Sequence, residues 1–239
     1  MNDASPLRLV SWNVHGWVGL DGIADLTRFR RVLSECRAQI LGLQEVSNDY
    51  REGSSASQLL RLAQELELSA EGGPTILRPE GDYGNALLST LPVKRVRHLD
   101  LSLPGREPRA ALDADLDWNR CRLRVMVTHL GLRPFERRYQ VKRLIEAIRQ
   151  HPYDVLVLMG DLNEWLIFGR PARWMHRHFG QRGGPPTFPS RMPLFALDRI
   201  FVEPPFLLGE VRTLRTPLAR LASDHLPVLG TLARPRYKG

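Results

Sequence analysis

The chain has little cysteine, little lysine and no long apolar run. Cys36 and Cys121 are the only two cysteines in 239 residues, which excludes a disulfide framework and a cysteine-based metal site. No apolar run approaches the roughly 18 residues that a membrane-spanning helix needs. Residues 1–12, MNDASPLRLVSW, lack the basic and apolar regions of a secretory signal. We therefore expect a cytoplasmic location, which is compatible with peripheral binding to a membrane surface.

Arginine carries almost all of the positive charge. Lys94, Lys142 and Lys238 are the only lysines, yet the formal net charge is +8. A basic surface speeds the capture of polyanions. An arginine-rich composition can equally reflect the base composition of a genome, so charge alone does not indicate a nucleic-acid-binding protein. The length and the 43% hydrophobic content fit one large core, and we expect a single domain over residues 1–239.

Strand-like and helical stretches alternate along the chain. Apolar runs predict strands at 7–14, 40–46, 85–90, 109–116, 121–130, 153–163, 195–202 and 225–232. Helical spacing predicts helices at 26–40, 55–68 and 134–150. The segment 169–193 is rich in Gly, Pro and Arg, and we expect it to lack regular structure over much of its length. This mixture indicates an α/β or α+β fold.

Polar side chains that can bind a metal or move a proton recur at the ends of these strands. They are Asn13, Glu45, Asn85, His129, Asp161, Asn163, Asp198, Asp224 and His225. Burying such groups unpaired would cost several kcal/mol each, so we expect them to gather in one place. Because the set is rich in oxygen and lacks cysteine, it suits Mg²⁺, with Mn²⁺ as the alternative.

Seven short motifs occur in order between residue 11 and about residue 228. They are SWN, LQE, GNALLS, THL, GDLN, LDRIFV and SDHLPV. Each is weak alone, but the series resembles that of the endonuclease/exonuclease/phosphatase (DNase I-like) family. This family includes DNase I-like nucleases, abasic-site endonucleases, inositol polyphosphate 5-phosphatases and neutral sphingomyelinases. HLGLRPFERRYQ and PPTFP further resemble its compact bacterial branch of metal-dependent hydrolases. The resemblance implies a four-layer α/β sandwich, in which two packed mixed β-sheets are flanked by helices.

The same resemblance implies a metal site and a group that activates water. Glu45 would bind the metal. Asn13 would contribute its amide oxygen to the metal or to a metal-bound water, and Asp224 would bind the metal or help to hold its waters. Asp161 would position and deprotonate the attacking water, and Asn163 would hydrogen-bond the phosphoryl group. The ordinary alternative for GDLN is a turn, because turns favour Gly, Asp and Asn.

It also implies a set of phosphate contacts. Asp198 would orient His225 and favour its protonated form, so that the imidazolium donates to a phosphate oxygen. The alternative for His225 is a core histidine satisfied by the backbone. His129 would contact phosphate, and so would Arg109, for which Arg106 is the competing candidate. Asn85 would either contact phosphate or only brace the site. The resemblance associates a histidine at position 129 with DNase I-like and sphingomyelinase-like members, and a tyrosine with abasic endonucleases.

The family resemblance indicates the type of reaction more clearly than it indicates the substrate. We expect a Mg²⁺-dependent phosphodiesterase that acts on a lipid head group or another small phosphoester. A nuclease is the alternative, but no basic strip with interleaved aromatics favours it. A non-catalytic binding module is the second alternative. We see no sign of an obligate protein partner.

Two sets of aromatic residues leave their roles open. Residues 168–186 mix Trp174, Met175 and Phe179 with Arg170, Arg173, Arg177 and Arg182. Such a mixture suits an anionic membrane surface or a nucleic-acid backbone, and a partly ordered surface loop is the alternative. Trp12, Trp165 and Phe188, at strand ends, either line the pocket or belong to the core.

Overall fold

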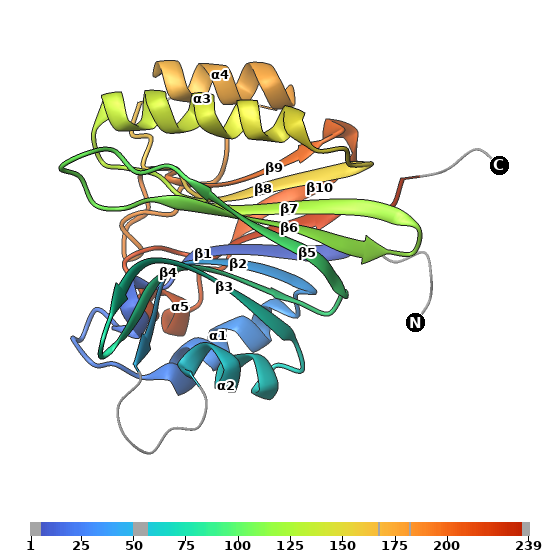
Figure 1. The fold of residues 1–239 in the computed structure, drawn as a ribbon. Helices are drawn as coiled ribbons and strands as arrows, with labels where there is room; N and C mark the ends of the chain where they lie inside the picture. Colours follow the sequence, from blue (N-terminus) through green and yellow to red (C-terminus); the bar gives the residue numbers. More distant parts are fainter. Residues whose placement is uncertain (1–5, 50–56, 167, 182, 236–239) are drawn as a thin grey trace.

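Two β-sheets pack face to face, with helices on both outer faces (Figure 1). The computed structural model describes residues 6–49, 57–166, 168–181 and 183–235. One sheet has the strand order β10-β11-β1-β2-β4-β3 and the other β5-β6-β7-β8-β9. The six-stranded sheet contains β1 (Leu7–Asn13), β2 (Ile40–Asp49), β3 (Ser69–Arg78), β4 (Gly81–Ser89), β10 (Leu208–Thr213) and β11 (Val228–Leu232). The five-stranded sheet contains β5 (Val93–Asp100), β6 (Ala110–Trp118), β7 (Cys121–His129), β8 (Val155–Asp161) and β9 (Asp198–Glu203).

The helices bury their apolar faces against the two sheets. The helices α1 (Leu26–Cys36), α2 (Gln58–Glu65) and α5 (Pro217–Ala222) cover the six-stranded sheet, whereas α3 (Pro134–Gln150) and α4 (Arg170–Phe179) cover the other. Two short 3₁₀ turns are η1 (His15–Trp17) and η2 (Pro205–Leu207). Each sheet joins parallel and antiparallel strands, because β1–β2 and β7–β8 pair in parallel. The expected four-layer sandwich of two mixed sheets is confirmed.

The strand register brings several polar residues to one edge of the sandwich. β7 pairs His129 with Asp161 of β8, and β8 in turn pairs Asp161 with Asp198 of β9. In the other sheet β1 ends at Asn13, which pairs with Gln44 of β2. Because carboxyl ends of parallel strands meet at the same edge, these side chains face one another across the two sheets.

Three strands and two α-helices among the described residues were not predicted from the sequence. Three of them, β3, β5 and β10, are outer strands of their sheets. Their sequences, SAEGGPTILR, VKRVRHLD and LGEVRT, lack a clean apolar alternation because outer strands carry charge, Gly and Pro. The helix α5 has only six residues, too few for a clear period. The N-terminal part of the predicted helix 55–68, residues 55 and 56, lies outside the described residues.

The helix α4 corrects the expectation that 169–193 is largely irregular. Gly169 is its N-cap and Pro171 lies in the first turn, where proline is tolerated. Met175 and Phe179 are buried in the core with α3, so they do not belong to a surface loop. Trp174 is half-buried, and Arg182 lies outside the described residues.

Gly160 allows β8 and β7 to approach each other just before Asp161. Its φ is +152°, and a Cβ at this position would lie 1.8 Å from the carbonyl oxygen of Thr128. We expect Gly160→Ala to lower the free energy of unfolding by roughly 2–5 kcal/mol, through backbone strain and steric overlap. Gly22→Ala is the matched control, because Gly22 also has a positive φ of +74° but open space around it. Urea unfolding measures both, and equal losses would show that overlap at Gly160 is unimportant.

Candidate active site

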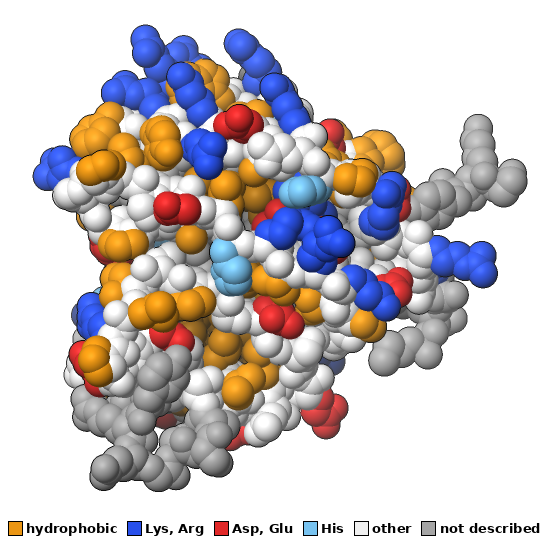
Figure 2. Space-filling model, in the orientation of Figure 1, with side chains coloured by type: hydrophobic (Ala, Val, Ile, Leu, Met, Phe, Trp, Pro, Cys, Tyr) orange, Lys and Arg blue, Asp and Glu red, His pale blue; other side chains and the backbone are white. Residues whose placement is uncertain are grey.

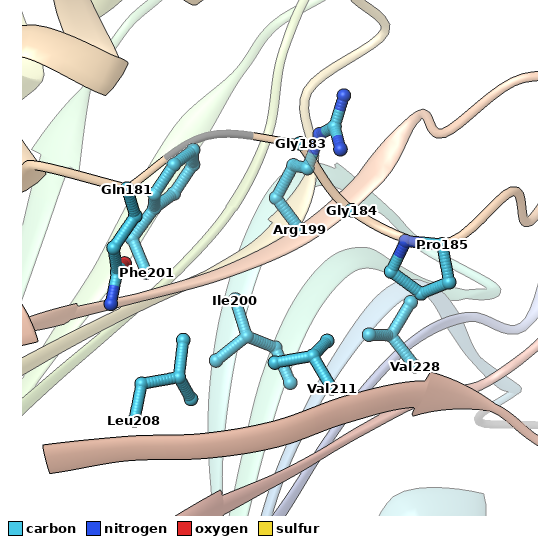
Figure 3. Close-up of a pocket in the computed structure, with 10 residues that line it drawn as sticks. All are labelled: Gln181, Gly183, Gly184, Pro185, Arg199, Ile200, Phe201, Leu208, Val211 and Val228. Carbon is cyan, nitrogen blue, oxygen red and sulfur yellow. The ribbon is translucent and has the colours of Figure 1, made fainter. Parts of the chain in front are cut away.

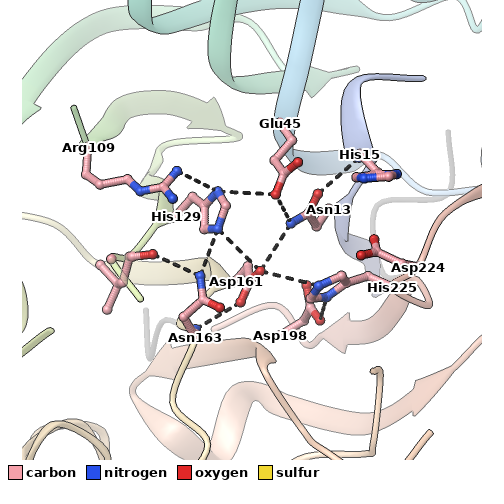
Figure 4. Close-up of polar contacts among 12 residues, drawn as sticks. Asn13, His15, Glu45, Arg109, His129, Asp161, Asn163, Asp198, Asp224 and His225 are labelled. Carbon is pink, nitrogen blue, oxygen red and sulfur yellow. Dashed lines mark hydrogen bonds and ion pairs between the residues drawn. The ribbon is translucent and has the colours of Figure 1, made fainter. Parts of the chain in front are cut away.

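The polar residues predicted from the sequence converge at the edge where β1, β7 and β8 end and β9 begins (Figure 4). The structure brings together Asn13, Glu45, Arg109, His129, Asp161, Asn163, Asp198 and His225. Residues from both sheets and from the loops after them contribute. This convergence was the central expectation from the sequence.

Asp161 lies at the centre of the cluster and is only 1% exposed. Its Oδ1 accepts from the backbone N–H of Asn163 at 2.9 Å, and its Oδ2 accepts from Asn13 Nδ2 at 3.1 Å. The Nε2 atoms of His129 and His225 lie 3.4 and 3.6 Å from Oδ2. A carboxylate surrounded in this way keeps acceptor capacity for a further donor, such as a water molecule.

A β-bulge places Glu45 at the same edge. The register of β2 against β4 shifts between Leu43 and Val46, and Glu45 has a φ of +57°. A positive φ is uncommon for a residue with a side chain and often accompanies a functional position. Burial raises the pKa of Tyr83, and the nearby Glu45 carboxylate raises it further, so the phenol stays protonated. Tyr83 was not predicted from the sequence, because it is an aromatic residue in an ordinary strand pattern.

Asn13 differs from its expected orientation. Its amide nitrogen donates to Glu45 Oε1 at 2.8 Å and to Asp161 Oδ2, so both acids face one nitrogen. Its amide oxygen accepts from the backbone N–H of His15 at 3.1 Å. In this arrangement Asn13 holds two carboxylates together. The amide would have to turn over to present its oxygen to a metal.

Asp198 and His225 form a hydrogen-bonded pair. His225 Nδ1 lies 2.7 Å from Asp198 Oδ2, and both residues are buried. Burial alone would lower the pKa of His225, but the charges of Asp198 and Asp161 outweigh it and raise the pKa to about 10. The imidazole is therefore protonated near neutral pH and directs Nε2 toward Asp161. The alternative of a core histidine satisfied only by the backbone does not fit these contacts.

His129 is held in the opposite protonation state. Burial lowers the pKa of its imidazole to about 3, although Asp161 opposes the shift. Arg109 NH1 lies 3.1 Å from Nδ1, and Asn163 Nδ2 lies 2.9 Å from Nε2. The site thus contains one charged and one neutral imidazole, and two titratable groups with such different pKa values can take separate roles.

Arg109, rather than Arg106, reaches the cluster. Arg109 is buried and pairs with Glu107 at 3.1 Å, and its Nε has no partner among the described residues. Arg106 is exposed, pairs with Glu136 at 3.2 Å, and lies over the ring of Phe135. The position of Arg109 is compatible with a phosphate contact, as predicted from the sequence.

Asn163 and Asn85 differ in what they can still bind. Asn163 has a φ of +49°, and its Nδ2 also donates to the Leu130 carbonyl at 3.0 Å. Asn85 Nδ2 donates to the Ala110 carbonyl at 2.9 Å, whereas its buried Oδ1 has no partner in the described structure. Because Oδ1 can only accept, Asn85 suits a substrate hydroxyl group better than the phosphate oxygen expected from the sequence.

Asp224 lies at the periphery of the cluster, beside His225 (Figure 4). The Ser223 hydroxyl donates to the Asn13 carbonyl at 2.8 Å, and Asp224 Oδ1 lies 3.3 Å from the same Oγ. Ser223 therefore ties the segment 223–225 to the end of β1. The sequence analysis quoted the SDH motif but assigned Ser223 no role.

The three aromatic residues whose roles the sequence left open differ in their location. Trp12 is fully buried in the core beneath the six-stranded sheet. Phe188 lies 4.9 Å from the His225 ring, and Trp165 packs edge-on against Phe188 at 5.6 Å, both measured between ring centroids. Trp165 and Phe188 therefore line the mouth of the site.

A cavity of about 330 Å³ lies elsewhere, between the outer strands β9 and β10 (Figure 3). Its floor is apolar and includes Ile200, Leu208 and Val211. Figure 3 shows the Arg199 guanidinium pointing away from that floor. None of the residues that line this cavity belongs to the polar cluster. The cavity lacks the carboxylates and histidines of that cluster, so we take the cluster as the candidate active site.

The fold and the polar edge define a class of proteins, the two-sheet α/β sandwich hydrolases. The model of the Endonuclease/Exonuclease/phosphatase family matches residues 10–225, and the chain belongs to this family of phosphoesterases and nucleases. It is 31% identical over 191 residues to "Uncharacterized protein YbhP" from Escherichia coli (strain K12), with 70% of each chain covered.

Solved structures support the same fold. An endonuclease/exonuclease/phosphatase from Beutenbergia cavernae has a TM-score of 0.75 and 21% identity, covering 96% of this chain and 72% of that one. The human Nocturnin catalytic domain with bound sulfate has a TM-score of 0.72 and 21% identity, covering 96% and 93%. Among the helices of the described residues, none combines the length and hydropathy that crossing a bilayer requires.

Proposed function

We propose that the protein is a Mg²⁺-dependent phosphodiesterase that hydrolyses a lipid head group or another small phosphoester. The observation that carries this proposal is the meeting of buried carboxylates, a charged imidazole and a buried arginine at one edge. The acids suit a cation and a water molecule, and the cationic groups between and beside them suit a phosphate. Membership of a hydrolase family supports the same reaction.

The donor set fits a hard divalent cation. Glu45 and Asp161 face a common nitrogen of Asn13 and supply only oxygen. Asp161, Asp198 and His225 also place ligand atoms within 4.8 Å of one another, but His225 Nδ1 is engaged by Asp198. We therefore assign the metal to Glu45, with Asp224 and a rotated Asn13 completing its surroundings. When bound, the ion would supply positive charge to the phosphoryl oxygens.

The remaining residues perform in-line hydrolysis. Asp161 holds the attacking water through its free acceptor capacity and takes its proton. As the water oxygen bonds to phosphorus, the P–O bond opposite to it breaks, and the released oxygen takes a proton from solvent. His225, charged through Asp198, donates from Nε2 to the phosphoryl group as negative charge builds there. Arg109 and Asn163 bind phosphate oxygens, and neutral His129, which lies between these two side chains, has one ring nitrogen that can accept from one of them. Positioning and electrostatics thus supply most of the rate acceleration.

Chelation tests the metal requirement. EDTA should reduce hydrolysis of bis-p-nitrophenyl phosphate by at least about 10²-fold, and added Mg²⁺ should restore it. Glu45→Gln should raise the Mg²⁺ concentration needed for half-maximal rate, whereas Glu71→Gln in the outer strand β3 should not. A rate that survives complete chelation would contradict the proposal.

A substrate panel separates the candidate functions. The panel contains bis-p-nitrophenyl phosphate, phospholipids, inositol phosphates and plasmid DNA, each with Mg²⁺. We expect hydrolysis of small or lipid diesters. Activity on DNA alone would instead establish the nuclease. Hydrolysis of none of them would favour the binding module.

A further inference from the structure

Exposed apolar side chains surround the mouth of the active site on the side of the five-stranded sheet. They come from the start of α3, the loop between β8 and α4, and the loop before β9. We call them the apolar rim, which comprises Leu132, Phe135, Tyr139, Trp165, Leu166, Phe168, Met192, Leu194 and Phe195. Phe168 is 84% exposed and Leu166 is 63% exposed. Exposed apolar residues gathered from three segments mark an interaction surface more often than scattered single ones do.

Arginines are interspersed with the rim. Arg133, Arg138 and Arg191 are exposed on the same three segments, and Arg170 and Arg173 are exposed on the adjoining helix α4. In the part of the chain that the structure describes, none of these five forms an ion pair with a carboxylate. Figure 2 shows hydrophobic side chains with basic ones between them along the left side of the molecule, where β8 ends in Figure 1. The surface therefore combines apolar groups with uncompensated positive charge.

The rim is continuous with the reacting groups. Trp165 packs on Phe195 and on Phe188, with ring centroids 4.9 and 5.6 Å apart, and Phe188 contacts the ring of His225. An amphipathic molecule whose apolar part contacts Trp165 thus has its polar part near the polar cluster. An anionic phospholipid surface offers both required chemistries, since acyl chains accept apolar side chains and head groups attract arginine.

We infer that the apolar rim docks on an anionic phospholipid bilayer and presents the active site to head-group phosphates in that surface. Apolar insertion and electrostatic attraction act together, so binding weakens when either is removed. Double-stranded DNA would use the arginines but would gain little from Phe168 and Leu166, whose side chains cannot pair with phosphate. The inference deepens the proposed function and rests on it for the identity of the substrate.

Vesicle flotation tests the docking. The probes are phosphatidylcholine vesicles with and without about one-third phosphatidylglycerol, at low and high salt. The intact protein should bind the anionic vesicles, and the double variant Leu166→Ser/Phe168→Ser should bind at least about tenfold more weakly. Phe206→Ser is the matched control, because Phe206 is 79% exposed in η2, beyond the far end of β9, and should leave binding unchanged.

A second pair of variants tests the charge. Arg170→Gln/Arg173→Gln should weaken binding and reduce its salt dependence, whereas Arg120→Gln, in the turn between β6 and β7, should not. Failure of the intact protein to bind anionic vesicles would overturn the inference. So would equal binding by the rim and control variants. Arginine-dependent binding to duplex DNA that ignores Leu166 and Phe168, without vesicle binding, would reassign the surface to nucleic acid.

A soluble substrate separates this inference from the proposed function. Hydrolysis of bis-p-nitrophenyl phosphate needs no bilayer, so the Leu166→Ser/Phe168→Ser variant should retain it at the parental rate. Loss of vesicle binding with retained hydrolysis supports the docking surface. Vesicle binding by a protein that hydrolyses no phosphoester would leave the docking intact and refute the phosphodiesterase.

Discussion

Asp161→Asn is expected to reduce hydrolysis by roughly 10²- to 10⁴-fold while substrate binding changes little. The Asp161 carboxylate accepts hydrogen bonds from the backbone N–H of Asn163 and from Asn13 Nδ2. The asparagine side chain has only one oxygen, so its NH₂ group would face one of these two donors. It also loses the charge that faces His225 and the acceptor that takes the proton of water. The expected loss is therefore in kcat rather than in KM.

The measurement is steady-state hydrolysis of bis-p-nitrophenyl phosphate with Mg²⁺. Asp117→Asn is a suitable control because Asp117 is a half-exposed acid that pairs with Lys94 at 3.2 Å, near the far end of β6. It should retain the parental rate. If Asp161→Asn stays within about tenfold of the parent, Asp161 does not take the proton.

His225→Gln should cost a similar factor, roughly 10²- to 10⁴-fold in kcat, because it removes the charged donor to the phosphoryl group. Asp198→Asn should cost about 10²-fold, since it leaves the imidazole in place but removes the carboxylate that charges and orients it. Asp198 acts through His225 and is therefore a positioning residue.

The double variant Asp198→Asn/His225→Gln distinguishes these roles. It should be no slower than His225→Gln alone, because Asp198 has no target once the imidazole is gone. Additive losses would mean that Asp198 contributes independently. His178→Gln is the matched control, since His178 also faces an acid, Glu203, at 3.6 Å but lies on α4 away from the cluster.

Many residues of the candidate site could be predicted because polar residues stand out in the sequence where they occur at the ends of apolar strands. Asp161 and His129 follow apolar strands, so their presence there indicates a shared purpose. Orientation was not predictable. The direction of the Asn13 amide depends on the backbone N–H of His15, and the free oxygen of Asn85 depends on the Ala110 carbonyl. Neither partner is visible in a one-dimensional pattern.

The layered fold was predicted from a family resemblance, but the outer strands and the helix α4 were not. The outer strands β3 and β5 carry the Gly-Gly-Pro and the Lys and Arg residues that discourage edge-to-edge association, and these residues hide the strand pattern. The opposite error occurred at α4, where Gly and Pro at its start and several arginines obscured the buried spacing of Met175 and Phe179.

The strand order has a consequence for how the protein is made. β11 lies between β10 and β1, so strands from opposite ends of the described residues pair, Leu7 opposite Leu232. During translation, the β11 side of β1 therefore stays without its partner until more than two hundred further residues have been made. Because His225 lies just before β11, the nascent chain can complete the polar cluster only after the segment that contains His225 has been translated.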